Sequence, residues 1–584
     1  MLDSDQQKIV DLPGGYWRVM AGPGSGKSTA ILARSARLSE TGIVLCATFT
    51  SEAAKSLRTR CAKQFPRVDT SMFTTLHAAA LRFAHDNHDA FPFRLSDDLL
   101  ADEGLSARAV FDVIGDKINF KKFTTWVSLQ KRKRISPDEA VSQSEKSGVN
   151  FDLAIGYKRY QKRLREQGLL DFDDLLFYQV EIMETRPDIR AKYQYNHLLI
   201  DEAQDCCELD WRLCQILTQK YKSLTAVGDG SQAIYGFRGG ISEHFLNMEE
   251  YFPGTVTYIL GRNYRSTPQI VSFVKNACPH PEVAEHFKAV KTINGIEPTI
   301  TGYSTDYREA EEVVKKIKQY NPDECAVLAR TNQALRCIEE CLINEAVKYH
   351  ILGDSGFWEA NEVQNVLAYI RCASSPTDNA VLRAIQTPFW PSKYVSKKKV
   401  CEQLKKKAEL TKSSIWSSMS YVPELKNFKS FLIGLLGYKY LPAAEAVKKV
   451  IQDLKAIQYY AEEQNVNPDR NPVDNIREIA RSASRFDSLD DFLNFVRKVS
   501  HASQRRSGVC LTTVHQGKGK EWPHVFFISV NKDILPHSKA VDDLEGEKCV
   551  FFVGSSRAEE TLDVSYYGTP SSFLEPWLKE EPNG

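Results

Sequence analysis

The sequence predicts an α/β protein built from parallel sheets, and three observations support this fold class. Short apolar runs that suit buried strands alternate with segments of helical periodicity along the chain. A glycine-rich run, residues 21–29, lies between one such strand and a helix. Two long helical segments, residues 83–170 and 373–505, divide the strands into two groups. We therefore expect two parallel-sheet domains, each with a mainly helical inserted subdomain.

The expected elements follow from the apolar pattern. The strands are residues 17–20, 43–49, 197–200, 224–228, 256–260, 325–329, 509–514, 525–530 and 550–553. Helices are expected over residues 30–34 and 152–167. The first domain then comprises residues 1–82 and 171–262 around the insertion 83–170. The second comprises residues 263–372 and 506–584 around the insertion 373–505.

Composition narrows the class of protein. A chain of 584 residues exceeds what one core holds, so several domains are expected. The net charge is only +1, so any nucleic-acid site must be a local groove. The thirteen cysteines are scattered, and no apolar run reaches the roughly 20 residues that cross a bilayer. We expect a cytoplasmic protein without a membrane partner.

The glycine-rich run has the residue types that hold a triphosphate. Glycines let successive backbone N–H groups face phosphate oxygens, and the following helix adds its N-terminal dipole. Lys27 would neutralise the β- and γ-phosphates, and the Ser28 hydroxyl would ligate Mg²⁺. The alternative, an ordinary turn before a helix, does not explain Gly-Lys-Ser at this offset. The predicted nucleotide-binding residues are Ala21, Gly22, Gly24, Ser25, Gly26, Lys27, Ser28 and Thr29.

Adjacent carboxylates follow a second apolar strand. Residues 198–200 lead directly into Asp201 and Glu202. Ligands of open α/β sheets bind at the carboxyl ends of the strands, so both side chains should reach the phosphate site. We expect Asp201 to hold Mg²⁺ through water and Glu202 to orient and deprotonate the attacking water.

A third strand, residues 224–228, leads to a polar turn and then to aromatic residues. Gln232 is placed to sense the γ-phosphate. Tyr235 and Phe237 beside Arg238 would form a stacking platform for unpaired bases. The alternative is that both rings belong to the core.

Arg265 and Arg557 each follow a predicted strand of the second group. Phosphoryl transfer needs cations at the γ-phosphate, and arginines supply them, although a lone arginine is usually a surface residue. If both reach the nucleotide, it lies between two domains, and closure upon it would drive movement.

Taken together, these motifs resemble the Rep/UvrD/PcrA group of superfamily 1 DNA helicases along nearly the whole chain. The match extends to residues 5–7, 47–54, 74–77, 171–176, 327–332 and 513–522. The resemblance implies that Gln6 reads adenine, Tyr264 stacks on it and Glu521 contacts the ribose. It also implies that Phe49 and His77 contact single-stranded DNA.

The resemblance implies two RecA-like motor domains, ATP and Mg²⁺ as cofactors, and 3′-to-5′ movement on single-stranded or tailed duplex DNA. Repair, replication, recombination and anti-phage defence all use such motors. Phe237 stands where the family has tryptophan, which keeps a stacking face, and Lys520 stands where it has leucine. One alternative is a translocase or motor subunit of a larger complex that unwinds weakly. Another is a non-enzymatic DNA-binding subunit gated by ATP.

Overall fold

The chain forms two compact units in a computed structural model. The described residues are 2–101, 120–236, 240, 242–352, 357–389, 397–462, 472–502, 507–538, 540 and 543–578. The first unit comprises Met1–Pro298, Ala540–Leu562 and Phe573–Gly584. The second comprises Thr299–Lys539 and Asp563–Ser572. The unit boundary after Pro298 differs from the predicted domain boundary after residue 262.

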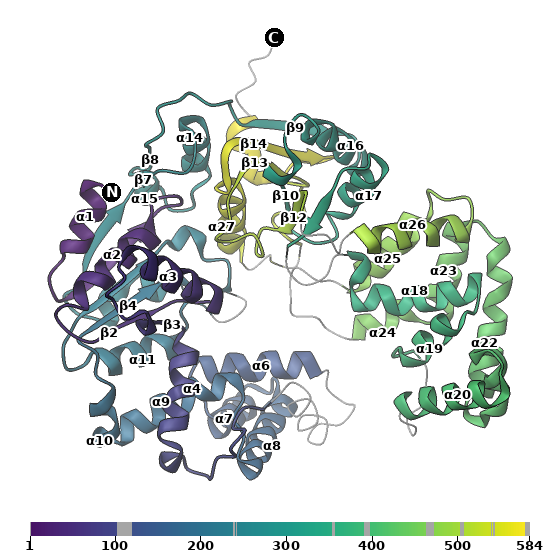
Figure 1. The fold of residues 1–584 in the computed structure, drawn as a ribbon, viewed down its shortest axis with the longest axis horizontal. Helices are drawn as coiled ribbons and strands as arrows, with labels where there is room; N and C mark the ends of the chain where they lie inside the picture. Colours follow the sequence, from purple (N-terminus) through teal and green to yellow (C-terminus); the bar gives the residue numbers. More distant parts are fainter. Residues whose placement is uncertain are drawn as a thin grey trace. The chain divides into compact units, whose positions relative to one another are not determined.

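The first unit is built on a parallel sheet (Figure 1). Its strands, in sheet order, are β3 (Phe73–Thr74), β2 (Val44–Ala47), β4 (His197–Asp201), β5 (Leu224–Gly228), β1 (Tyr16–Ala21) and β6 (Val256–Leu260). Neighbours β4, β5 and β1 pair in parallel, so their carboxyl ends emerge side by side at one edge. The predicted strands of the first group are thus confirmed.

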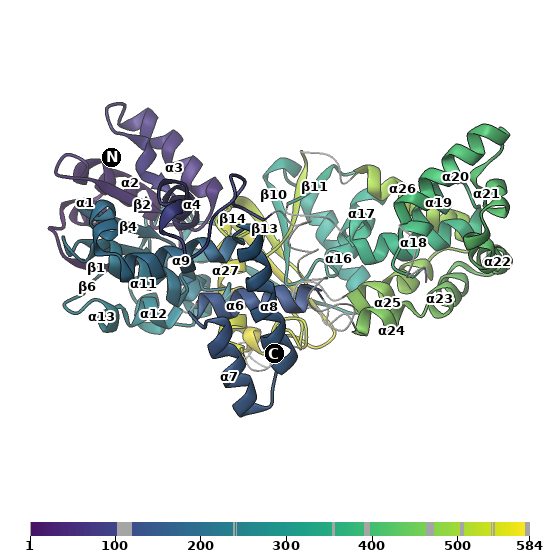
Figure 2. The same cartoon turned by 90° about the horizontal axis from the view of Figure 1, so that it is seen from below.

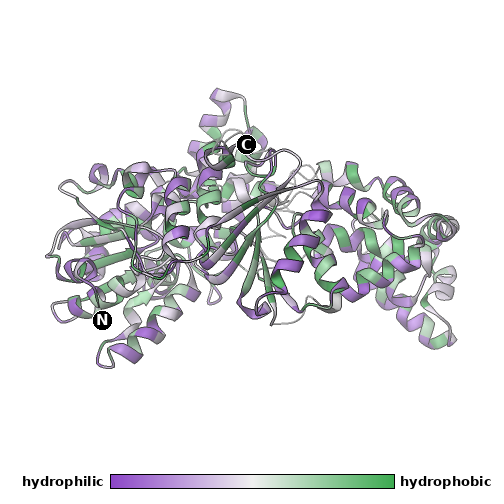
Figure 3. Ribbon diagram, turned by 90° about the horizontal axis from the view of Figure 1, so that it is seen from above, coloured by the Kyte–Doolittle hydropathy of each residue, from purple (hydrophilic) through white to green (hydrophobic). Residues whose placement is uncertain are grey.

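Helices cover both faces of this sheet (Figures 1 and 2). One face packs against α1 (Ser4–Asp11), α2 (Lys27–Leu38) and α3 (Ser51–Gln64). The other packs against α4 (Leu76–Asp86), α9 (Phe172–Thr185), α11 (Glu208–Thr218), α12 (Ser242–Leu246) and α13 (Met248–Tyr251). In β4, Leu199 enters the first core while Leu198 and Ile200 enter the second, as the two-residue period of a strand requires. Figure 3 shows hydrophobic residues gathered on the strands.

A helical insertion of the first unit includes α6 (Phe120–Arg132), α7 (Pro137–Ser147) and α8 (Phe151–Gln167). The helix expected over residues 152–167 is therefore confirmed. The buried Lys131 of α6 pairs with Asp171 at 2.6 Å and with Asp174 at 2.7 Å, both at the start of α9. These ion pairs fix the insertion to the sheet-covering helix that follows it.

The C-terminal part of the first unit corrects one prediction. Residues 550–553 are not a strand but lie inside α27 (Leu544–Ser555). Val550, Phe551, Phe552 and Val553 are all buried, so this helix lacks the polar face that reveals a helical period in sequence. The unit also contains α10 (Pro187–Arg190), β7 (Arg262–Asn263), α14 (Pro268–Ala277), α15 (Pro281–Ala284), β8 (Lys288–Ala289) and α28 (Glu575–Leu578).

The second unit contains another sheet, flanked by helices, and a helical insertion lies between its strands β11 and β12 in the chain. The strands, in sheet order, are β11 (Tyr349–Ile351), β12 (Val509–Thr513), β10 (Cys325–Ala329), β13 (Trp522–Phe527), β14 (Ala558–Tyr567) and β9 (Thr299–Tyr303). Of β14, the residues from Asp563 onward belong to this unit. Pairs β10–β12, β10–β13 and β9–β14 are parallel. Helices α16 (Asp306–Ile317) and α17 (Arg336–Asn344) pack on this sheet. The predicted α/β class holds for both units.

The insertion of the second unit has its own apolar core. Its helices are α18 (Asn361–Ser374), α19 (Asp378–Gln386), α20 (Lys397–Thr411), α21 (Ile415–Ser418), α22 (Lys426–Leu435), α23 (Ala443–Asp453), α24 (Ala456–Glu462), α25 (Pro472–Ala483) and α26 (Leu489–Ala502). The buried Arg336 of α17 pairs with Glu478 of α25 at 2.9 Å and with Asp306 of α16 at 3.4 Å. This buried cation joins the insertion to the sheet-bearing part of its unit. None of the helices in the described part of the chain is both long and apolar enough to cross a bilayer.

A buried arginine ties α1 to the helix that follows the glycine-rich loop. Arg34 of α2 is fully buried and donates to the carbonyls of Ile9 at 2.9 Å and Leu12 at 2.8 Å. It also donates to the Thr225 hydroxyl of β5 at 3.0 Å. The last carbonyls of a helix have no partner within the helix, so Arg34 satisfies the end of α1. Burial lowers the pKa of Arg34 to about 10.

We expect Arg34→Met to destabilise the first unit by about 2–4 kcal/mol, because it leaves buried carbonyls unsatisfied. Arg37→Met, on the same helix, is the comparison: Arg37 also donates to α1, at the Val10 carbonyl at 2.9 Å, but its side chain is about half exposed, so its loss should cost less than about 1 kcal/mol. Calorimetry of both variants, with hydrogen exchange of α1, checks this. Equal thermal shifts would show that the buried Arg34 stabilises α1 no more than the half-exposed Arg37 does.

Candidate nucleotide site and nucleic-acid interface

The glycine-rich loop, residues 22–26, connects β1 to α2 and has the backbone geometry of a phosphate cradle. Gly24 and Gly26 have φ angles of 67° and 76°, the left-handed region that favours glycine. Helix α2 begins at Lys27, three residues before the predicted start. No side chain of the described residues caps its N-terminus, so its first N–H groups face the loop.

Gln6 of α1 lies against this loop. Its Nε2 donates to the Ser25 carbonyl at 3.2 Å, and its Oε1 accepts from the Asp3 amide at 3.3 Å. The Ser25 hydroxyl is buried and has no hydrogen-bond partner among the described residues. Loop and helix are thus joined by the glutamine side chain. The reading of adenine by Gln6 stays a prediction.

The carboxylates of the predicted site lie at the end of β4. Asp201 is the last residue of the strand, and Glu202 follows with φ 54° and ψ 43°, a conformation that is uncommon outside glycine. Lys27 Nζ lies 3.3 Å from Glu202 Oε1. Lys27 and Glu202, which are far apart in the sequence, therefore lie at one site, as predicted.

Burial raises the pKa of Asp201 to about 7; the Glu202 carboxylate adds to this rise, and Lys27 opposes it. A divalent cation bound beside Asp201 would oppose this rise and favour the charged form of the carboxyl. The loop glycines, the uncapped α2 and the orphaned Ser25 hydroxyl likewise fit a nucleotide phosphate. Ser28 and Asp201 are the residues that would hold Mg²⁺.

A polar turn follows β5 and extends the site. Asp229 is buried, and its carboxylate accepts from Gln232 Nε2 at 2.6 Å and from the Ser231 amide at 3.0 Å. Gln204 connects this turn to the carboxylates, because it donates to Glu202 Oε2 at 2.6 Å and accepts from the Asp229 amide at 3.0 Å. Burial raises the pKa of Asp229, and Lys27 opposes this.

The two predicted arginines meet at Ser556. Arg265 Nη1 donates to the Ser556 carbonyl at 3.0 Å, and Arg557 Nη2 donates to its hydroxyl at 2.7 Å. Arg557 Nη2 also lies 3.5 Å from Gln232 Oε1. Arg557 follows a helix rather than the predicted strand. Both arginines belong to the first unit, whereas the sequence interpretation assigned them to the second domain.

Asn263 anchors the Arg265 turn to the glycine-rich loop. Its Nδ2 donates to the Pro23 carbonyl at 2.9 Å, and its Oδ1 accepts from the Arg265 amide at 2.9 Å. The Tyr264 amide donates to the Gly24 carbonyl at 2.9 Å. The structure thus places Tyr264 and Arg265 directly beside the loop, and stacking of Tyr264 on adenine stays a prediction.

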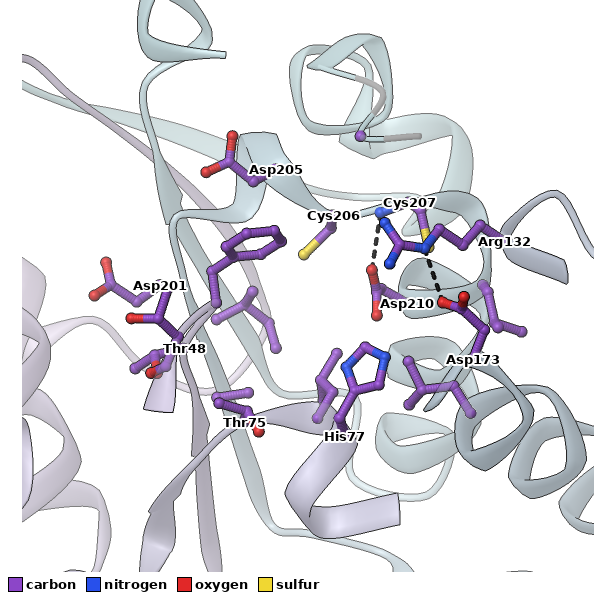
Figure 4. A pocket seen from close by; sticks show the side chains of 18 of the residues that line it. Thr48, Thr75, His77, Arg132, Asp173, Asp201, Asp205, Cys206, Cys207 and Asp210 are labelled. Atoms are coloured by element: carbon purple, nitrogen blue, oxygen red, sulfur yellow. Dashed lines mark hydrogen bonds and ion pairs between the residues drawn. The ribbon is translucent and has the colours of Figure 1, made fainter. Parts of the chain in front are cut away.

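A pocket of about 250 Å³ opens beside the strand ends and contains predicted DNA contacts (Figure 4). Phe49 and His77 line it together with the carboxylates of Asp173 and Asp210. Burial lowers the pKa of His77, which favours the neutral ring, and its Nε2 has no hydrogen-bond partner among the described residues. Arg132 Nε donates to Asp173 Oδ1 at 2.9 Å at the far wall.

The aromatic side chains of this region are paired. Phe49 stacks on Tyr235 with ring centroids 5.7 Å apart, and His77 stacks on Phe172 at 4.2 Å. Tyr235 is therefore paired with another ring, and it does not belong to the apolar cores of the described residues, which was the alternative for this residue. Flat faces that stack on one another also suit nucleobases. The DNA contacts of these residues stay predictions.

Three predicted site residues are not part of the contacts described above. Phe237 and Arg238 lie outside the described residues. Glu521 lies in the second unit, before β13, and its contact with ribose stays a prediction.

Sequence reasoning assigned no role to several side chains that complete the site. Gln204, Asn263 and Ser556 supply the hydrogen bonds that join its segments, and Phe172 supplies a stacking face. The sequence signal for Gln204, Asn263 and Ser556 was that each is a polar residue one or two positions from a residue with a predicted role. For Phe172 the signal was an aromatic residue directly after Asp171; its exposure at the first position of α9 is a finding of the structure.

The fold and this site define a nucleotide-binding α/β motor with a phosphate loop, adjacent carboxylates and two arginines. The UvrD/REP helicase N-terminal domain matches residues 2–253, and the UvrD-like helicase C-terminal domain matches residues 258–569. The chain belongs to the UvrD/REP helicase family. The predicted family, fold class and enzyme class, a helicase, are therefore confirmed.

Relatives match along nearly the whole chain. The ATP-dependent DNA helicase PcrA of Staphylococcus epidermidis is 27% identical to this chain over an aligned length of 620 residues. The alignment covers 98% of this chain and 84% of the relative. The protein of the same name from Staphylococcus aureus is 26% identical over 634 residues, covering 100% of this chain and 86% of the relative.

We expect Gly26→Ala to weaken nucleotide binding by about tenfold or more, since a left-handed alanine is strained by about 1–3 kcal/mol. Its Cβ would also lie 2.4 Å from Gln6 Nε2. Gly14→Ala is the control, because its Cβ would meet no atom within 4 Å. Titration with a fluorescent ATP analogue checks this, and unchanged affinity in Gly26→Ala would mean that the loop does not cradle the phosphates.

Proposed function

We propose that the chain is an ATP-driven DNA helicase and translocase that moves 3′-to-5′ along single-stranded DNA and unwinds tailed duplexes. Its membership of the UvrD/REP helicase family and its relatives named ATP-dependent DNA helicase support the proposal. We further infer that it works in the cytoplasm in DNA repair, replication, recombination or anti-phage defence.

The observation that carries the proposal is one connected site in the first unit. Lys27 contacts Glu202 at 3.3 Å, and Arg265 and Arg557 both bond to Ser556. Charged side chains that are far apart in the sequence are thus held close together in this unit. Phosphoryl transfer needs this set: a cation at the phosphates, a base for water and further cations for the developing charge.

Each residue then has a defined part. Lys27 would shift from Glu202 to the phosphates and so release the Glu202 carboxylate to orient and deprotonate water. Ser28 and Asp201 would hold Mg²⁺, which neutralises phosphate charge when bound. Gln232, Arg265 and Arg557 would stabilise charge on the transferred group. Closure of the second unit on the nucleotide stays a prediction.

The pocket beside the strand ends supports an interface with unpaired bases. Phe49, Tyr235, His77 and Phe172 offer ring faces, which recognise any base through stacking. We therefore expect low sequence specificity and binding that weakens as salt rises.

We expect Glu202→Gln to bind ATP and DNA normally but to lose about 10²- to 10⁴-fold in DNA-stimulated ATPase turnover, because glutamine cannot accept the proton of water. Glu250→Gln, an exposed glutamate of α13, is the matched control. Steady-state ATPase with and without single-stranded DNA measures both variants. Near-normal turnover of Glu202→Gln would contradict the proposed catalytic role.

Strand displacement on 3′- and 5′-tailed duplexes tests direction. We expect ATP-dependent unwinding of the 3′-tailed substrate and little of the 5′-tailed one. The opposite preference would overturn the proposed polarity, and DNA-stimulated ATPase without displacement would favour a translocase that does not unwind alone.

A further inference from the structure

Gln204 lies two residues beyond Glu202 and uses both ends of its amide. It is 1% exposed. Its Nε2 donates to Glu202 Oε2 at 2.6 Å, and its Oε1 accepts from the Asp229 amide at 3.0 Å. The side chain therefore bridges the segment after β4 and the segment after β5. A buried glutamine with both ends bonded has one fixed orientation.

The Glu202 carboxylate needs such support. Its backbone is in the left-handed region, and its other oxygen, Oε1, contacts Lys27 at 3.3 Å. In the proposed function Lys27 turns to the phosphates, so its hold on Glu202 weakens when catalysis begins. The bond from Gln204 does not involve the nucleotide and would remain. Gln204 is thus placed to keep the carboxylate aimed at its water.

The other end of Gln204 leads toward the predicted DNA interface. Asp229 bonds to Gln232, and Gln232 Oε1 lies 3.5 Å from Arg557 Nη2. Three residues after Gln232, Tyr235 stacks on Phe49. A shift of this short segment would therefore reach the Asp229 amide and the amide group of Gln204.

We propose that Gln204 is a positioning residue that fixes the Glu202 carboxylate relative to the Asp229–Gln232 turn, and so links DNA binding to hydrolysis. The inference rests on the proposed function, because it needs DNA at Tyr235 and water at Glu202. It assigns Gln204 no contact with substrate.

Two variants disturb this bridge in different ways. Gln204→Met keeps the length of the side chain but removes both hydrogen bonds. Gly228→Ala keeps the glutamine side chain but puts a Cβ 2.4 Å from Gln204 Oε1, so the amide group must shift. The controls are Gln179→Met, a buried glutamine whose Oε1 has no hydrogen-bond partner among the described residues, and Gly14→Ala.

We expect Gln204→Met and Gly228→Ala each to lower the kcat of DNA-stimulated ATPase by about tenfold or more, since a bond to a charged group is lost. The KM for ATP should change by less than about twofold, because the bridge touches neither loop nor nucleotide. In nucleotide-free protein, hydrogen exchange of the Asp229 amide should accelerate in Gln204→Met. Both controls should match the parent in all three measurements.

The outcomes separate the inference from the function on which it rests. If the parent protein shows DNA-stimulated ATPase and Gln204→Met retains its kcat and its DNA stimulation, the inference is wrong and the proposed function stands. If Gln204→Met does not fold, Gly228→Ala decides by the same criterion. If the parent protein shows no DNA-stimulated ATPase, the proposed function fails and the inference fails with it.

Discussion

The site depends on the order of three parallel strands. Because β4, β5 and β1 are neighbours and run in the same direction, their carboxyl ends deliver the glycine-rich loop, Asp201 with Glu202, and Asp229 to one edge. The contact between Lys27 and Glu202 follows from this register. Only β5 lies between β4 and β1 in this sheet. One more strand between them would move Lys27 and Glu202 apart by a further strand spacing of about 4.8 Å.

Around that edge, neutral polar side chains hold the charged ones in place. Gln6 fixes the loop to α1, Asn263 fixes the loop to the Arg265 turn, and Gln204 fixes Glu202 to the turn after β5. Amides suit this work because one group donates and accepts without adding charge beside the phosphates. The charged residues supply chemistry, and the amides determine where that chemistry can occur.

Much of this arrangement could be predicted from the sequence. Strand-ending motifs such as residues 198–202 carry both an apolar pattern and a chemical signal, so their place at the end of a strand could be predicted. Residues 550–553 carried only an apolar run, which a buried helix and a buried strand share, and the strand prediction was wrong. For the bridging amides the only sequence signal was their nearness to a motif, because residue type alone does not distinguish a glutamine that bonds at both ends from any other glutamine.

The most direct test is a structure of the protein bound to single-stranded DNA and the transition-state mimic of Mg²⁺, ADP and aluminium fluoride. We expect Lys27, Arg265 and Arg557 within hydrogen-bond distance of the fluoride, and Glu202 bonded to the water opposite the ADP oxygen. Arginine side chains directed away from the fluoride, or Glu202 without contact to that water, would contradict a site assembled from these residues.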